Sequence, residues 1–497
     1  MTEKRCRLAV VSDIHFASSP LPNAAARHGE YGDTLLLRAV HRFNRYIRPD
    51  AVLVAGDMIN DPCDPEAPEL LIKLRNILDK LQMPYRVIPG NHDPIHEIFY
   101  KAFPEHREPL DVGKYRVLPF TDPETPGNNA CRQPEDFERM RQARENWSGE
   151  LIALQHVPVG PPDDHPCWYN FINANDVLDA MQKYRFKACI CGHEHAGLPV
   201  REINGTTCIC TPGLCEVPLS YLIVDFDDDG QVHVIRENLS LDAALELEDH
   251  HVHTTFAYCN ENLALPKTRE LGQLFGLSKI VYTEHSSHLL FTKDECIQRR
   301  HFYDGLSGVL PSSSRVEDYF RTQQEIDKDF EITGMEVDYD MFGRSVVHPE
   351  DRPRLQFCNG AVHAMDTMYN RSDMSRIKEE FMFLCEAALR DGVQALAHPF
   401  RIFSFNGLGV KYPVPEELFV QLADLLKKYS VAAEINFHCN QPEEEFFALC
   451  VQKGVKISLG SDTHNLYEVG EFYPHLKLLD KIAPGWRSNP QEIMVQA

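Results

Sequence analysis

The chain contains no CxxC pair, no long apolar run and no tract rich in lysine and arginine. Its 15 cysteines are scattered, so the spacing that marks a structural zinc site or a redox dithiol is absent. The first apolar run, residues 8–11, is far too short for a signal peptide or a membrane span. We therefore expect a cytoplasmic protein that does not associate with membranes.

The composition is that of an ordinary globular protein. Of the 497 residues, 43% are hydrophobic and 25% are charged, which supplies enough apolar material for a core in each of two domains. The 50 basic residues against 74 acidic ones give a formal net charge of -24, which repels a phosphate backbone over most of the surface. The sequence therefore disfavours stable binding to nucleic acid.

Four pairs of metal-binding side chains, each pair separated by one residue, occur along the sequence. Residues i and i+2 of an extended segment point the same way, so each pair can bind one cation at the end of a strand. Two pairs lie in each half of the chain, which predicts two metal sites on two domains. The pairs are Asp13/His15, His193/His195, His251/His253 and Asp462/His464.

The first half alternates short apolar runs with amphipathic stretches, a pattern typical of an α/β domain. Helices are expected over residues 33–47, 66–82 and 173–184. Each apolar run ends in polar residues, and open α/β sheets place their chemistry at the carboxyl ends of strands. We expect the first domain to span residues 1–240, followed by a linker over residues 241–248.

Five motifs follow the expected strands of the first half. In this order they resemble the calcineurin-like metallophosphoesterase superfamily, which implies an αββα sandwich. The alternative is that these histidines are ordinary loop and core residues, as is usual for any one such motif found alone. The motifs are Asp13-x-His15, Gly56-Asp57, Gly90-Asn91-His92-Asp93, His156 and Gly192-His193-x-His195.

This resemblance implies two divalent metals, manganese, iron or zinc, bridged by Asp57. His92 lies outside the implied ligand set, which makes it the expected general acid or phosphate-stabilising group, with Asp93 as its orienting partner. The two cations would stabilise the charge that gathers on the phosphate oxygens. The implied ligands are Asp13, His15 and His195 for one metal, and Asn91, His156 and His193 for the other.

In the second half of the chain, the pattern of an apolar run followed by a candidate metal ligand recurs more regularly than in the first half. Seven apolar runs are each followed by a candidate ligand, which predicts a β/α barrel with its site on the carboxyl face. Helices are expected over residues 375–390, 415–428 and 443–453. The signatures resemble the polymerase and histidinol phosphatase (PHP) family, which implies a distorted (β/α)7 barrel over residues 249–497. They are Asp249-His-His251-Val-His253, Thr283-Glu-His285, Gly334-Met-Glu336, Val362-His363, His398-Pro399 and Ser461-Asp462-Thr-His464.

The second resemblance implies two or three metals, zinc, manganese or iron. Cys259 stands where many members have another histidine or an acid, and a role as a thiolate ligand and a structural role explain it equally well. Arg401 could bind a terminal phosphate through paired hydrogen bonds, or form a salt bridge at the start of a helix. The implied ligands are His251, His253 and Asp462 for one metal, His285 and His464 for a second, and His363 and His398 for a third, with Glu336 bridging the first and third.

The two resemblances together predict a bifunctional metal-dependent phosphoester hydrolase. The first domain is most similar to compact bacterial phosphodiesterases and would open a cyclic nucleotide or another small diester, and the second would act as a phosphomonoesterase. One alternative is a nuclease or a nucleic-acid repair or defence factor. Another is a phosphodiesterase whose PHP domain is a non-catalytic sensor or partner-binding module. The expected partner is a small, nucleotide-like phosphorylated substrate, and the sequence leaves the oligomeric state open.

Overall fold

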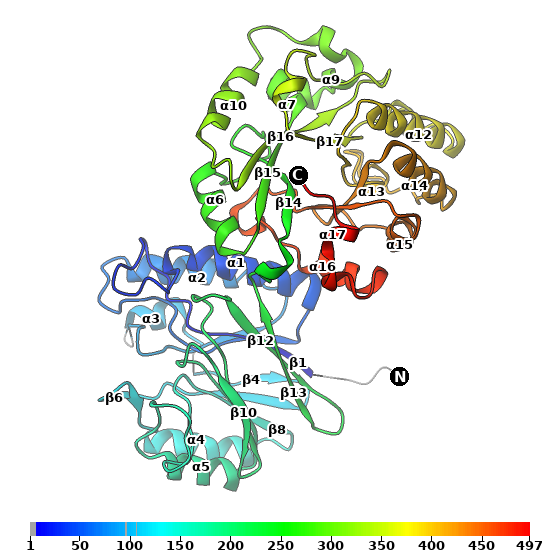
Figure 1. Ribbon diagram of the computed structural model, residues 1–497. Coiled ribbons are helices and arrows are strands. Elements are labelled where there is room, and N and C mark those ends of the chain that lie inside the picture. The colour runs from blue at the N-terminus through cyan, green and yellow to red at the C-terminus, as the bar shows by residue number, and fades with distance from the viewer. Residues whose placement is uncertain (1–5, 95–96, 106) are drawn as a thin grey trace. The chain divides into compact units, whose positions relative to one another are not determined.

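A computed structural model describes residues 6–94, 97–105 and 107–497 (Figure 1). The chain divides into two units, one ending at Ser240 and the other starting at Leu241. The expected linker, residues 241–248, lies within the second unit, where Ala243–Leu245 form a 3-10 helix (η3) and Glu248 begins a strand. Among the described residues, no helix is both long and apolar enough to cross a bilayer.

The first unit contains two sheets. The strands of the first sheet are β1 (Cys6–Val11), β2 (Ala51–Val54), β3 (Tyr85–Val87), β12 (Ser220–Phe226) and β13 (Val232–Asn238). Their order is β13-β12-β1-β2-β3, in which β1, β2 and β3 are parallel and β12 pairs antiparallel with β1. The carboxyl ends of β1 and β2 therefore lie at the same edge of the sheet.

The second sheet has the order β10-β11-β9-β8-β5-β4, and its central pairs β5·β8, β8·β9 and β9·β11 are parallel. A two-stranded hairpin of β6 and β7 lies apart from it. The strands are β4 (Leu110–Val112), β5 (Tyr115–Pro119), β6 (Glu124–Thr125), β7 (Asn129–Ala130), β8 (Glu150–Leu154), β9 (Phe186–Cys191), β10 (Leu198–Ile203) and β11 (Thr206–Cys210).

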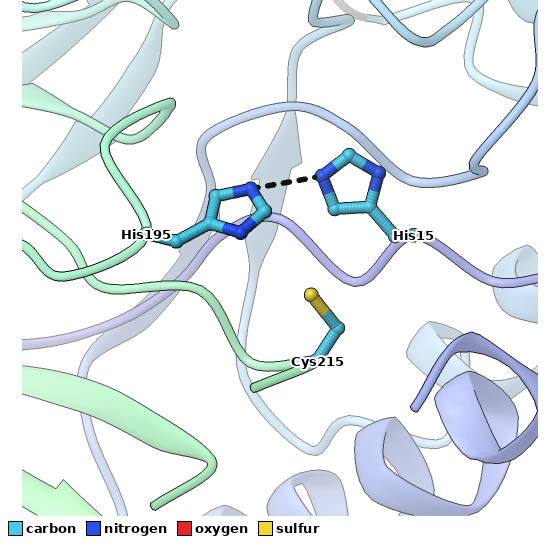
Figure 2. Close-up of side chains that lie close together, drawn as sticks. All are labelled: His15, His195 and Cys215. Carbon is cyan, nitrogen blue, oxygen red and sulfur yellow. Dashed lines mark hydrogen bonds between the residues drawn. The ribbon is translucent and has the colours of Figure 1, made fainter. Parts of the chain in front are cut away.

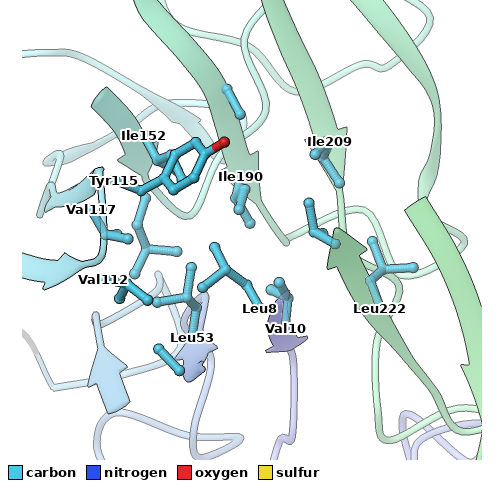
Figure 3. Close-up of a cluster of buried hydrophobic side chains, with 14 of the residues drawn as sticks. Leu8, Val10, Leu53, Val112, Tyr115, Val117, Ile152, Ile190, Ile209 and Leu222 are labelled. Atoms are coloured by element: carbon cyan, nitrogen blue, oxygen red, sulfur yellow. The ribbon is translucent and has the colours of Figure 1, made fainter. Parts of the chain in front are cut away.

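The main core of the first unit lies between these two sheets (Figure 3). Alternate residues of β1 point to opposite faces, and Leu8 and Val10 enter this core. Leu53 of β2 lies beside them, and Ile152 and Ile190 come from the second sheet. The two sheets thus pack through apolar side chains that the alternation of each strand supplies.

Helices cover the outer faces. Met140 and Val177, from α4 and α5, pack against Leu151 and Phe186 of the second sheet, and α1 and α2 lie beside the first sheet (Figure 1). The unit is a mixed α/β fold with the expected layer order of helix, sheet, sheet, helix. The helices are α1 (Gly32–Arg42), continued by a π-helix over Phe43–Ile47, α2 (Ala67–Leu78), α3 (Glu97–Ala102), α4 (Pro134–Glu145) and α5 (Ala174–Lys183).

The second unit is built on seven parallel strands whose order in the sheet follows their order in the chain. Val252 at the end of the first strand bridges Thr463, just after the last strand, and the amide of Asp462 donates to the carbonyl of His251. The sheet is therefore a nearly closed barrel, compatible with the expected (β/α)7 fold. The strands are β14 (Glu248–Val252), β15 (Lys279–His285), β16 (Glu331–Asp338), β17 (Phe357–Ala361), β18 (Ala395–Leu396), β19 (Ala432–Asn436) and β20 (Ile457–Gly460).

Helices connect these strands, as right-handed crossovers between parallel strands require. The three helices expected from periodicity correspond to α12, α14 and α15, while the short helices between β15 and β16 were not expected. The helices are α6 (Leu265–Leu274), α7 (Ser286–Leu290), α8 (Lys293–Ile297), α9 (Arg300–Tyr303), α10 (Val316–Thr322), α11 (Asp366–Tyr369), α12 (Met374–Arg390), α13 (Arg401–Ser404), α14 (Glu417–Tyr429), α15 (Glu444–Lys453), α16 (Tyr473–Ile482) and α17 (Pro490–Ile493).

Replacing Leu8 by alanine tests the role of the core between the sheets. Leu8 has no exposed surface, so Leu8→Ala leaves a cavity and is expected to lower the free energy of unfolding of the first unit by about 3 kcal/mol. Urea unfolding of the full chain, followed by circular dichroism, measures this loss. The control is Ile72→Ala in α2, where the side chain is 52% exposed and the expected loss is below about 1 kcal/mol. Equal losses in both variants would contradict the packing described.

Candidate metal centres

The backbone turns sharply at several candidate ligands that follow strands of the first unit. Asp13, Asp57 and His193 have φ values of 51°, 52° and 71°, in the left-handed region that residues with a β-carbon seldom adopt. These residues follow β1, β2 and β9. Such strained conformations persist only where surrounding contacts fix them, and they cluster at functional sites.

Asp13, His15, Asp57 and His195 form one cluster. His15 Nε2 lies 3.1 Å from His195 Nε2 and 3.5 Å from Asp57 Oδ2. His195 Nε2 lies 3.5 Å from Asp13 Oδ1. Two imidazoles and two carboxylates from three separate segments of the chain thus converge on one small volume.

Asn91, His156 and His193 form a second cluster that shares Asp57 with the first. His156 Nε2 lies 3.1 Å from both Asn91 Oδ1 and His193 Nδ1. It also lies 3.4 Å from Asp57 Oδ2, the same oxygen that approaches His15. Asp57 therefore stands between the two clusters, as expected of a bridging carboxylate.

Two imidazoles hold a proton on the side that faces away from these clusters. His156 Nδ1 lies 2.7 Å from the carbonyl oxygen of Ala55, and His195 Nδ1 lies 2.7 Å from Glu216 Oε1, so each Nδ1–H donates there. In the neutral rings the Nε2 lone pairs face the clusters. Nε2 of the neutral His156 ring then faces the amide oxygen of Asn91. Because both atoms are hydrogen-bond acceptors, a separation of 3.1 Å requires a cation or a proton between them.

The surroundings of these ligands also suit a divalent metal. Asp13 Oδ1 and His193 Nε2 are buried and have no hydrogen-bond partner among the described residues. Gly90 leaves room at the centre, because a β-carbon there would lie 2.2 Å from Asp57 Oδ1 and 2.7 Å from His156 Nε2. The donor set of imidazole, carboxylate and amide oxygen fits divalent transition metals.

In the chain without metal, protons take up the charge of the carboxylates. Burial disfavours the imidazolium of His156, but the Asp57 carboxylate outweighs it and raises the pKa of His156 to about 10. Burial is likewise outweighed at His195, where the Asp13 carboxylate 3.5 Å away, together with Glu216, raises the pKa to about 9. Both rings are therefore protonated at neutral pH until a metal displaces the protons.

His92 lies at the edge of the first cluster. Its ring centroid is 4.7 Å from that of His15, and its backbone N–H donates to Asp57 Oδ1. His92 Nδ1 lies 2.6 Å from the carbonyl oxygen of Asn60 and donates to it. The remaining ring nitrogen, Nε2, is therefore the atom through which His92 can exchange a proton with a substrate.

The expected pairing of His92 with Asp93 is corrected by the structure. Asp93 is buried, and its carboxylate accepts hydrogen bonds from the backbone N–H groups of Met58, Ile59 and Gly90. Its physical role is therefore to hold together the two loops that carry Asp57 and Asn91. The preference of a buried carboxylate for several fixed backbone donors explains the difference.

Three residues near the first centre belong to none of the motifs found in the sequence. Glu216 orients His195, as described above. Cys215 is buried against His15 and His195, and the candidate ligand atoms of these three residues lie within 4.8 Å of one another (Figure 2). Burial, together with the carboxylate of Asp13, raises the pKa of the Cys215 thiol well above its usual value. Arg27 Nη1 lies 3.4 Å from His15 Nδ1 and brings a positive charge to the rim.

In the second unit, Glu336 lies among four imidazoles. Its Oε2 is 2.5 Å from His285 Nδ1 and 3.5 Å from His251 Nε2. Its Oε1 is 2.9 Å from His398 Nε2 and 3.1 Å from His363 Nε2. Despite these short distances, the buried atoms Glu336 Oε2, His251 Nε2 and His363 Nε2 make no contact with hydrogen-bond geometry among the described residues, which fits a shared cation.

Asp462 connects the remaining candidate ligands. Its Oδ1 lies 3.0 Å from His253 Nε2. His464 Nδ1 donates to the Asp462 carbonyl at 2.7 Å, so the Nε2 lone pair is available to the cluster that His464 forms with His253 and His285. Arg401 Nη1 donates to Asp462 Oδ2 at 2.8 Å, so the structure favours the salt-bridge interpretation of Arg401 over that of a free phosphate-binding group.

Cys259 lies beside a candidate ligand, with Sγ 3.8 Å from His285 Nε2. Burial, with help from Glu284, raises the pKa of this thiol to about 12, so only a bound metal would make it a thiolate at neutral pH. His288 is close to both, but its Nδ1 accepts from the N–H of Tyr258, which places the proton of the neutral ring on Nε2. This tautomer leaves no lone pair on Nε2, which disfavours His288 as a metal ligand.

Two carboxylates orient ligands of the second centre. Asp338 Oδ1 accepts from His363 Nδ1 and Glu434 Oε1 accepts from His251 Nδ1, both at 2.7 Å. Each contact turns the other ring nitrogen toward Glu336, in the manner of the carboxylate–histidine–metal arrangement. Their positions at the ends of β16 and in β19 are the only signal that sequence offered for this role.

Glu216→Ala tests the orientation of His195. Loss of the carboxylate frees the ring and its tautomer, so the affinity of the first unit for a divalent metal is expected to fall by about 10- to 100-fold. Competition with a chromogenic chelator measures the affinity. Glu202→Ala, at an exposed position in β10, is the control and should leave it unchanged. An unchanged affinity in Glu216→Ala would rule out the orienting role.

Metal binding is also expected to release protons. Since the pKa values of His156 and His195 are raised to about 10 and about 9, both rings must lose a proton on binding, and affinity should fall as the pH drops below these values. Calorimetric titration of the metal-free protein with zinc, in two buffers of different ionisation enthalpy, counts the protons. His233→Gln, an exposed control, should release the same number. Binding without proton release would contradict the raised pKa values.

Comparisons with known proteins concern the first unit. Residues 6–197 match the family model described as calcineurin-like phosphoesterase. No curated protein matches the chain significantly. A dimetal phosphatase from Danio rerio is 14% identical with a TM-score of 0.39, and the match covers 47% of this chain and 99% of that one. A purple acid phosphatase from yellow lupin (Lupinus luteus) seeds is 13% identical with a TM-score of 0.34, covering 48% and 54% of the two chains. An archaeal phosphodiesterase is 13% identical with a TM-score of 0.25, covering 46% and 99%.

The family match spans all five motifs of the first half, from Asp13 to His195. These motifs are the residues that the structure brings together around Asp57. Their donor atoms fit divalent metals, which this family uses. Residues 6–197 form a calcineurin-like metallophosphoesterase domain, and through it the chain is a metal-dependent phosphoester hydrolase.

Proposed function

We propose that the chain is a bifunctional hydrolase, in which the first unit is a dinuclear phosphodiesterase for a cyclic nucleotide or another small diester and the second is a PHP-type phosphomonoesterase. The observation that carries the proposal is the presence of a buried carboxylate surrounded by imidazoles in each unit. Asp57 lies between two clusters in the first, and Glu336 lies among four rings in the second. Manganese, iron or zinc suits both donor sets.

In the first unit, the bound metals would supply Lewis acidity and an activated water. Asp57, through one oxygen within 3.5 Å of two imidazoles, fixes the spacing of the two ligand clusters. His92 keeps Nδ1–H on the carbonyl of Asn60, so the proton that it can give to the leaving oxygen is the one on Nε2 of its imidazolium. A pocket lined by Asn91, His156 and Glu124 adjoins the second cluster.

In the second unit, imidazoles contact both carboxylate oxygens of Glu336. His363 and His398 contact the same one, Oε1. Asp338 fixes the ring of His363, so its Nε2 is held toward Glu336 rather than toward solvent. When bound, metals there would neutralise the charge of a phosphoryl group. His363 and His398 line a pocket that also includes Arg299, Tyr369 and Phe405.

Alanine substitutions at the two central carboxylates test the division of labour. Asp57→Ala is expected to reduce cleavage of bis(p-nitrophenyl) phosphate to background while release of phosphate from p-nitrophenyl phosphate persists, and Glu336→Ala is expected to do the reverse. The reason is that each carboxylate holds together the ligands of one unit only. Cyclic nucleotides and nucleoside monophosphates are then assayed in the same way, with metal content measured in every variant.

Asp176→Ala and Glu379→Ala, which replace exposed carboxylates in α5 and α12, are the matched controls and should retain both activities. Loss of both activities in one of the two central variants would overturn the division of labour. Monoester release that survives Glu336→Ala, with no metal in the second unit, would instead identify the barrel as a non-catalytic module. Cleavage of oligonucleotides in preference to small diesters would favour the nuclease alternative.

A further inference from the structure

The pocket of about 750 Å³ in the second unit extends well beyond the candidate metal ligands. His363 and His398 line it at the metal centre, and Arg299, Tyr369 and Phe405 line it elsewhere. The lining thus continues from the candidate ligands His363 and His398 to side chains that are not candidate ligands. A ligand bound at the metal centre can therefore also reach Arg299 and Phe405 within the same pocket.

Arg299 is the distinctive polar residue of this pocket. Its guanidinium carbon lies 3.9 Å from the centroid of the Tyr369 ring. Across residues 6–94, 97–105 and 107–497, no carboxylate lies within ion-pair distance of it. The other arginine of the pocket, Arg401, is paired with Asp462 at 2.8 Å. Arg299 thus retains N–H donors that the protein itself does not use as an ion pair.

Arg299 combines a left-handed backbone with a half-buried side chain. Arg299 precedes α9 with φ at 58°, in the left-handed region that favours glycine. Although the chain has 74 acidic residues, none of those that the structure describes forms an ion pair with this guanidinium. A guanidinium presents planar, paired donors that match phosphate and carboxylate oxygens, and stacking on an aromatic ring pre-orients it for them.

The remaining wall of the pocket suits the body of an organic molecule. Phe405 is 53% exposed and Ile297 is 67% exposed, so both present apolar surface to a ligand. Nδ1 of the buried His301 has no hydrogen-bond partner among the described residues. The pocket thus combines a metal centre, an apolar wall and one guanidinium free of carboxylates.

We infer that the second unit binds a phosphomonoester that carries a second anionic group, with the reacting phosphoryl group at His363 and His398 and the second anion on Arg299. The apolar body of the substrate lies against Phe405 and Ile297. This inference rests on the proposed phosphomonoesterase function for the reaction itself. Binding of a ligand with two anionic groups can nevertheless be measured without turnover.

The experiment compares alkylphosphonates with α,ω-alkylenebisphosphonates of three to six carbons, which cannot be hydrolysed because their phosphorus is bonded to carbon. Binding to the metal-loaded full chain is measured by titration calorimetry. For at least one length, the bisphosphonate is expected to bind wild type about tenfold or more tightly than the matching alkylphosphonate, because it gains charge-assisted hydrogen bonds. Arg299→Met should abolish that preference, and Arg299→Lys should retain part of it.

Arg371→Met is the matched control, since Arg371 also has a left-handed backbone, with φ at 51°, but is exposed and lies outside the pocket lining. Arg371→Met should keep the wild-type preference. Glu336→Gln, which changes the metal centre, should weaken binding of both the alkylphosphonate and the bisphosphonate. The inference fails if no length shows a preference in wild type, or if the preference survives Arg299→Met. A preference that depends on Arg299 in a chain without phosphatase activity would refute only the proposed reaction.

Discussion

Burial of the carboxylates of Asp57 and Glu336 is the constraint on which both units depend. A buried carboxylate costs several kcal/mol unless positive charge or hydrogen-bond donors surround it. Burial alone would raise their pKa values, but His156 and His15 lower that of Asp57, and His363 and other imidazoles lower that of Glu336. These imidazoles come from different strands. The strand order that brings the strand ends together is therefore also what stabilises the buried carboxylates.

A second layer of contacts decides which way each imidazole faces. In the first unit a backbone carbonyl, that of Ala55, holds His156, and the carboxylate of Glu216 holds His195. In the barrel, carboxylates on strands do this work, with Asp338 holding His363 and Glu434 holding His251. The difference follows from topology, since the strands of a barrel direct side chains into a shared interior, where residues of strands that are not neighbours meet at the same level.

The sequence predicted features that are local along the chain. Apolar runs followed by Asp13, Asp57 or Glu336 identified strand ends, and helical periodicity identified α5 and α12, because both signals lie within a few residues. Contacts between distant segments could not be read in this way. Glu216 has no motif of its own, Asp93 adjoins His92 but binds backbone amides of another loop, and Arg299 lies among short helices with weak periodicity.

The two pockets differ in the charges that line them, which bears on the proposed order of diester cleavage followed by monoester cleavage. The pocket of the first unit includes Asp122, which Arg132 neutralises, and Glu124, which is exposed and forms no ion pair among the described residues. A diester carries one negative charge, and its hydrolysis produces a monoester with up to two. Under the proposed functions, Glu124 would therefore repel the monoester product more strongly than the diester substrate, and Arg299 would favour binding of that product in the second unit.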